Sequence, residues 1–183
     1  EDLIHPYVSG NKWRKLKYNL LYAKEEGFQK VLTFGGAFSN HIVATAAAAS
    51  ALDMQSVGLI RGEEHFSLNP TLTQAQILGM HLRYMDRASY RLKTEKDWSV
   101  SFQEHYIIPE GGMNKLAVQG CEEILDGTGF DVACCACGTG GTIAGIINSL
   151  EPHQKAIGFP VLKGTDFLEK NVQEYASSKE WEM

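Results

Sequence analysis

The chain has 183 residues, with 17 basic and 22 acidic side chains and a formal net charge of −5. Hydrophobic residues make up 44% of it and charged residues 21%, which is typical of a folded globular protein. The negative balance, without a clustered basic surface, disfavours a nucleic-acid partner, and no apolar run approaches the roughly 20 residues of a membrane span.

The first residues, Glu1 to Pro6, lack the basic and apolar regions of a signal peptide. We therefore expect a cytoplasmic protein. The chain also lacks an initiator methionine, so we expect it to begin inside a longer protein.

A basic cluster follows, Ser9-Gly10-Asn11-Lys12-Trp13-Arg14-Lys15-Leu16-Lys17-Tyr18. Such a cluster is most often a solvated helix face, with Trp13, Leu16 and Leu20 as its packing stripe. Lys12 differs only in sitting at the expected helix start, where the pKa of a lysine can be lowered. The spacing does not distinguish Lys12 from Lys15 or Lys17.

Short β-branched runs then alternate with longer helical stretches. We expect strands at 31–34, 56–60, 81–85, 106–108, 131–136 and 156–159, and helices at 42–52, 70–78, 115–125 and 142–150. The charged stretch 86–104 predicts a surface helix or loop. Strands separated by helices indicate an α/β fold with a mainly parallel, twisted sheet, in which ligands bind beyond the carboxyl ends of the strands.

The first strand-to-helix turn reads Gly35-Gly36-Ala37-Phe38-Ser39-Asn40-His41. Ser39 or Asn40 is a good N-cap residue, which is a purely structural explanation. The functional alternative is that Ser39, Asn40 and His41 present polar groups to a small carboxylate. His41 is the weakest of these three candidates.

Three of the four cysteines, Cys134, Cys135 and Cys137, lie on one apolar run, and Cys121 precedes them. In a strand, Cys135 and Cys137 share a face and Cys134 points the other way. Convergent ligands with zinc-site spacing are missing. We therefore expect buried reduced thiols and no metal.

The second glycine-rich turn, Gly138-Thr139-Gly140-Gly141-Thr142, follows a strand and opens a helix. Glycines allow close backbone approach, and the N–H groups at a helix start favour an anion. The spacing matches neither a P-loop nor a dinucleotide fingerprint. The turn predicts a cradle for a phosphorylated cofactor, with a ligand-free tight turn as the alternative.

Four segments together resemble the 1-aminocyclopropane-1-carboxylate deaminase/D-cysteine desulfhydrase family of pyridoxal 5'-phosphate (PLP) enzymes, which have fold type II and are tryptophan synthase β-like. The matching segments are SGNKWRKL at 9–16, GGAFSNH at 35–41, PEGG at 109–112 and GTGGT at 138–142. The resemblance covers nearly the whole chain. It implies a three-layer αβα architecture in two lobes, with residues 18–105 in a small lobe and residues 1–17 and 106–183 in part of a large PLP-binding lobe.

The resemblance also implies roles for single residues. Lys12 forms the Schiff base with PLP, Asn40 contacts the cofactor ring oxygen, and Ser39 helps to hold the substrate carboxylate. The residues Gly138, Thr139, Gly140, Gly141 and Thr142 hold the phosphate.

Departures from the family are visible. Family members are longer, so we expect this chain to be incomplete at its C-terminus and to lack the group that faces the pyridine nitrogen and a substrate-proximal tyrosine. Members also often have Gly where this chain has Ser9, and another residue at Trp13. A sheet left partly bare would favour self-association, and we expect a homodimer.

The implied activity is that of a deaminase or lyase acting on a small amino acid. The reaction is either 1-aminocyclopropane-1-carboxylate to 2-oxobutanoate and ammonia, or D-cysteine to pyruvate, sulfide and ammonia. Lys12 would act as base on the Cα proton of D-cysteine. Two alternatives remain: a PLP-binding protein of this fold without turnover, and an unrelated α/β binding protein with a merely structural glycine turn.

Overall fold

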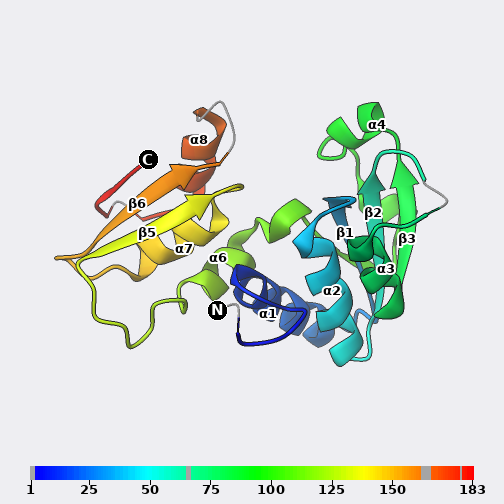
Figure 1. Ribbon diagram of the computed structural model, residues 1–183, viewed down its shortest axis with the longest axis horizontal. Coiled ribbons are helices and arrows are strands. Elements are labelled where there is room, and N and C mark those ends of the chain that lie inside the picture. The colour runs from blue at the N-terminus through cyan, green and yellow to red at the C-terminus, as the bar shows by residue number, and fades with distance from the viewer. Residues whose placement is uncertain (1–2, 65–66, 162–165, 178) are drawn as a thin grey trace.

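The computed structural model describes residues 3–64, 67–161, 166–177 and 179–183. Within them the chain forms two parallel sheets, one with strand order β3-β2-β1-β4 and one with order β5-β6-β7 (Figure 1). The strands are β1 Lys30–Gly36, β2 Gln55–Arg61, β3 Met80–Met85, β4 His105–Ile108, β5 Val132–Cys137, β6 Lys155–Pro160 and β7 Trp181–Glu182. The predicted α/β class with mainly parallel sheets is confirmed.

Helices connect the strands. They are α1 Asn11–Glu25, α2 Asn40–Ala51, α3 Pro70–Ile77, α4 Arg87–Arg91, α5 Trp98–Ser101, α6 Lys115–Cys121, α7 Gly141–Ser149 and α8 Asp166–Tyr175, with the short 3-10 turn η1 at Glu110–Gly112. The expected strands and helices fall within a few residues of the observed ones from β1 to β6, whereas α8 and β7 were not predicted.

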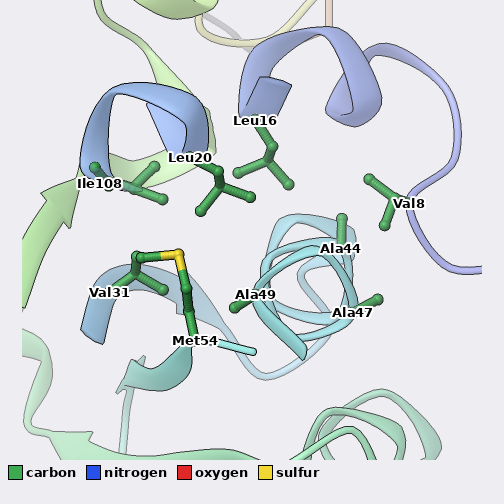
Figure 2. Close-up of a cluster of buried hydrophobic side chains, with 10 residues drawn as sticks. Val8, Leu16, Leu20, Val31, Ala44, Ala47, Ala49, Met54 and Ile108 are labelled. Carbon is green, nitrogen blue, oxygen red and sulfur yellow. The ribbon is translucent and has the colours of Figure 1, made fainter. Parts of the chain in front are cut away.

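The four-stranded sheet is covered on both faces. On one face, α1 and α2 pack over β1 and β4 through a cluster that includes Leu16, Leu20, Val31 and Ile108 (Figure 2). Small side chains on α2 allow this close packing, because alanine is the main residue that the helix presents. Both central strands carry five consecutive buried residues, as expected for strands covered on two sides.

The opposite face of this sheet is covered by α4 and α5, two short and largely exposed helices in the stretch 86–104 where a surface helix or loop was expected. Tyr90 and Trp98 are only 2% and 8% exposed and pack with Leu32 and Phe34. The Phe34 and Trp98 rings meet edge-on with centroids 5.4 Å apart. Two aromatic residues in a charged stretch therefore cover this face of the sheet, although the stretch lacks the apolar periodicity of a packed helix.

The three-stranded sheet is covered on one face only, within the residues that the structure describes. Its inner face packs Cys135, Cys137 and Ala156 against α7 and α8. On the outer face, Val132 and Phe159 are 48% and 55% exposed. This alternation along β5 confirms that Cys135 and Cys137 share a face. Cys134 is exposed, so the expectation that all these thiols are buried is wrong for that residue.

Helix α1 joins the two halves of the molecule, since it packs on α2 and on α6. At Gly120 of α6 an added Cβ would lie 2.0 Å from the Arg14 carbonyl oxygen, so only glycine permits this approach. The fully buried Asn19 exchanges amide hydrogen bonds with Asn114, and Tyr106 donates to Asn19 at 3.0 Å. The start of α1 is therefore fixed against both halves.

The packing stripe of α1 differs in part from the expected one. Leu16 and Leu20 are buried as predicted, but Trp13 is 39% exposed, because the buried stripe of α1 runs instead through Lys15, Asn19 and Ala23. Helix α1 passes unbroken through position 17, and β4 pairs with β1 up to position 108. The lobe boundaries at 17/18 and 105/106 stay a prediction.

Candidate active site

Lys12 lies in the first turn of α1. The helix follows Gly10, whose φ of 59° is a left-handed conformation that glycine adopts without steric cost. The Lys12 Nζ donates to the Gly111 carbonyl oxygen at 3.4 Å. Beside it, the Asn11 Nδ2 donates to the Thr142 Oγ1 at 2.8 Å, which ties the start of α1 to the first turn of α7.

The Gly138–Thr142 turn connects β5 to α7. Gly140 has a φ of 92°, and a Cβ there would lie 2.9 Å from a methyl carbon of Val172. At Gly138 an added Cβ would meet no atom within 4 Å, so open space lies beside this backbone. No side chain of the described residues caps α7, which leaves first-turn N–H groups available to an anion.

A pocket of about 150 Å³ lies where these two segments meet. Complete ligand sites measure roughly 300–1,000 Å³, so this pocket suits the anionic end of a larger molecule. Its walls come from α1, the end of β5 and the start of α7. The lining residues are Asn11, Lys12, Lys15, Ala136, Cys137, Gly138, Thr139, Gly140, Thr142 and Ile143.

Lys15 also lines this pocket, and the sequence named it only as an alternative to Lys12. It is 2% exposed, and its Nζ lies 3.5 Å from the position that a Cβ on Gly141 would take. Burial lowers the pKa of Lys15, and no hydrogen bond or ion pair to its Nζ is present among the described residues. A buried amine without a counter-charge is costly, and an anion at the start of α7 would remove that cost.

The structure separates the three lysines that spacing could not. Lys17 points to the Glu123 carboxylate, with Nζ–O distances of 2.7 and 2.8 Å, and the hydrogen bond to Glu123 raises its pKa. Lys12 and Lys15 instead share one pocket. Lys15, Asn19 and Ala23 lie four residues apart on the buried side of α1. Polar residues at the spacing of a packing stripe are the sequence signal that could have identified Lys15.

Burial, and then the charge of Lys15, lowers the pKa of Lys12 from 10.5 to about 7. An amine with this pKa is substantially neutral at pH 7 and has a free electron pair. It can therefore attack a carbonyl carbon or accept a proton.

The turn at Pro109–Gly112 lies against Lys12, Lys15, Thr139 and His41. Gly111 and Gly112 have φ values of 67° and 76°. A Cβ on Gly111 would lie 3.2 Å from Thr139, and one on Gly112 would lie 3.3 Å from Lys15 and 3.5 Å from His41. Paired glycines after a strand end are the sequence signal for this close approach.

Ser39, Asn40 and His41 lie at the start of α2, which also contacts the Pro109–Gly112 turn. Ser39 precedes the helix, but its side chain makes no capping hydrogen bond. Neither Ser39 nor Asn40 lines the pocket that contains Lys12. His41 is 2% exposed and its Nε2 lies 2.8 Å from the Thr33 Oγ1. Their contacts with cofactor or substrate stay predictions.

The charge state of His41 follows from its surroundings. Burial, and then the charges of Lys12 and Lys15, hold its pKa well below the usual 6.5. The imidazole is therefore neutral at pH 7, and it adds no positive charge to the two lysines.

Among the described residues no group of three or more His, Cys, Asp or Glu side chains could hold a metal ion. No helix in the described ranges has both the length and the apolar character needed to cross a membrane.

The family model described as "Pyridoxal-phosphate dependent enzyme" matches residues 1–172. The chain belongs to this family. The residues around the Lys12 pocket fit the cofactor chemically: an amine of lowered pKa for its aldehyde, and a helix start with a buried, unpaired lysine for its phosphate.

Two curated relatives show which members of this family the chain is similar to. A Thermotoga maritima protein named "Putative 1-aminocyclopropane-1-carboxylate deaminase" is 34% identical over 98% of this chain and 63% of its own length. The Arabidopsis thaliana "Bifunctional D-cysteine desulfhydrase/1-aminocyclopropane-1-carboxylate deaminase, mitochondrial" is 32% identical over 80% of this chain and 42% of its own. The resemblance to proteins of these names is confirmed, and the chain spans less than two thirds of either relative.

Solved structures agree on the fold. The structure described as "ACC deaminase homologue" superposes with a TM-score of 0.75 at 25% identity, covering 95% of this chain and 61% of the other. A fungal L-serine ammonia-lyase from Rhizomucor miehei superposes with a TM-score of 0.67 at 15% identity, covering 94% and 56%. At that identity the second likeness concerns the fold alone.

Proposed function

We propose that this chain is part of a PLP-dependent deaminase or lyase acting on a small amino acid, either 1-aminocyclopropane-1-carboxylate or D-cysteine. One observation carries the proposal: Lys12, Lys15 and the Gly138–Thr142 turn line the same pocket. The names of the relatives support the two substrate candidates.

Residues of the pocket and of the start of α2 would hold different parts of the cofactor and the substrate. The N–H groups at the start of α7 and the Lys15 ammonium would bind the phosphate, and Lys12 would bond the aldehyde through its ε-amine. Asn40 would contact the ring oxygen and Ser39 the substrate carboxylate. When bound, PLP supplies an electron sink for negative charge at Cα.

The chain's own residues would manage the proton. The Lys12 amine, with a pKa of about 7, can take the Cα proton of D-cysteine at neutral pH. The Gly111 carbonyl oxygen orients that amine through a hydrogen bond. Because 1-aminocyclopropane-1-carboxylate has no Cα proton, opening of its ring needs a proton transfer at another carbon atom.

The test is an oxoacid assay of the PLP-loaded protein with each substrate. Lys12→Ala should reduce the rate by about 10²–10⁴-fold or more, the usual range for a lost proton-transfer group. Lys24→Ala is the matched control, since Lys24 is an exposed lysine on the same helix and should leave the rate unchanged.

Two outcomes contradict the proposal in different ways. Equal rates for Lys12→Ala and the unsubstituted protein would remove Lys12 from the reaction. Bound PLP without oxoacid from either substrate would indicate a cofactor-binding protein without this turnover.

A further inference from the structure

A second and larger pocket lies at the carboxyl end of the four-stranded sheet, where parallel sheets commonly bind ligands. Its volume is about 640 Å³, within the range of small-molecule sites. It is built from the ends of β2 and β3, the start of α3 and the Ala37–Phe38 segment. It shares no lining residue with the pocket of Lys12.

Four charged side chains line this pocket, two of each sign: Arg61, Arg87, Glu63 and Asp86. Within the described residues, none of the four forms an ion pair with another protein group. Asp86 does use one carboxylate oxygen to cap α4, accepting from two backbone N–H groups at 3.0 Å. The balance of charge disfavours a simple anion or cation, because either would also meet two like charges.

The remaining walls are largely apolar. Phe38 is 81% exposed, an unusual position for a phenylalanine, and it lines the pocket together with Leu68 and Leu72. Tyr84 also lines it, and its hydroxyl is buried without a hydrogen-bond partner in the described part of the chain. Buried hydroxyl groups normally have a partner.

We propose that this pocket binds a free α-amino acid with an apolar side chain, at a site separate from that of the proposed reaction. A guanidinium of Arg61 or Arg87 matches the carboxylate through paired hydrogen bonds. The carboxylate of Glu63 or Asp86 matches the ammonium group. The apolar side chain then covers Phe38 and its neighbours.

The position of this site gives the ligand a route to the candidate active site. The Asn69 side chain caps α3 by accepting from the Leu72 N–H, and its Nδ2 donates to the Ala37 carbonyl oxygen at 2.9 Å. Ala37 and Phe38 lead directly into Ser39. A ligand in the pocket therefore contacts the turn that carries the predicted substrate-binding residues.

Isothermal titration calorimetry with L-leucine tests the proposal, with leucinamide and 4-methylpentanoate as probes that lack the carboxylate or the ammonium group. We expect a dissociation constant of about 1 mM or tighter for L-leucine and at least about tenfold weaker binding of either analogue, since each loses a charge-assisted contact. Equal binding of all three, or no binding of L-leucine well above millimolar concentration, would overturn the proposal.

Substitutions locate the binding. Arg61→Gln and Arg87→Gln should each weaken it, the more important of the two by about tenfold, whereas Arg91→Gln removes an exposed arginine outside the pocket and should not. Lys12→Ala should leave it unchanged. Loss of binding in Lys12→Ala with retention in both pocket variants would assign L-leucine to the other site and overturn the proposal. Circular dichroism of each variant verifies that it is folded.

Discussion

The two sheets of this molecule are built from similar parallel strands but are covered differently. The four-stranded sheet has helices on both faces, and its central strands are buried along nearly their whole length. The three-stranded sheet has helices on one face, and residues such as Val132 and Phe159 are exposed on the other. Stability should therefore be concentrated in the first sheet, whereas the Gly138–Thr142 turn belongs to the second.

The pocket of Lys12 lies where the two regions meet. Helix α1 packs with the first sheet through Leu16 and Leu20 and with α6 through Gly120. A well-covered region thus holds Lys12 and Lys15 against a turn of the less covered region. The pocket of Lys12 therefore depends on contacts across this junction as much as on either sheet.

The largest difference in the free energy of unfolding should appear between two phenylalanine substitutions, one in each sheet. Phe34 is 4% exposed in the first sheet, and Phe159 is 55% exposed in the second. Phe34→Ala should lower the free energy of unfolding by about 3–5 kcal/mol, and Phe159→Ala by about 0.5 kcal/mol or less. Urea unfolding measures both, and similar losses would contradict the difference in cover.

A smaller effect is expected at the junction. Folding lowers the pKa of Lys12 from 10.5 to about 7. Between these pH values the unfolded chain holds a proton that the folded chain has lost, so Lys12 makes the free energy of unfolding rise with pH. Lys12→Met should remove this rise and stabilise the chain at pH 7 by about 2–4 kcal/mol, given roughly 1.4 kcal/mol per pKa unit.

Urea unfolding at several pH values between 7 and 10.5 measures that change. Lys24→Met is the control, because Lys24 is exposed on the same helix. An unchanged pH dependence in Lys12→Met would show that the Lys12 amine is solvated rather than buried.

The smallest effect on stability is expected on the open face of the second sheet, where the consequence should be association instead. Phe159→Ser removes a large exposed apolar side chain and should change the free energy of unfolding by about 0.5 kcal/mol or less. It should also weaken self-association, which sedimentation measures as a shift toward the monomer. Thr73→Ser, a conservative substitution on α3, is the control and should change neither the stability nor the sedimentation of the protein.

Much of this architecture could be predicted because the apolar runs and periodicities in the sequence coincide with the observed strands and helices. The apolar runs around Val31 and Val57 predicted β1 and β2, and the glycine-rich segments after β1 and β5 predicted the two turns beside the candidate site. The shared face of Cys135 and Cys137 followed from the geometry of a strand alone.

The rest depended on tertiary contacts. Trp98 covers a sheet from a stretch that reads as a charged surface. Lys15 and Lys17 are the same residue type only two positions apart. Lys15 is buried where Gly112 and Gly141 approach it, whereas Lys17 lies beside Glu123. The place of Gly111 between Lys12 and Thr139 depends on segments about 100 and 30 positions away, which no local pattern encodes.

The most direct test of the central claim is borohydride reduction of the PLP-loaded protein followed by peptide mapping. If Lys12 bonds the cofactor aldehyde while Lys15 and the Gly138–Thr142 turn bind its phosphate, the pyridoxyl group will be found on Lys12, and Lys15→Met will weaken PLP binding without moving the label. A label on Lys15 or Lys17, or none on Lys12 in protein that retains PLP, would contradict the account.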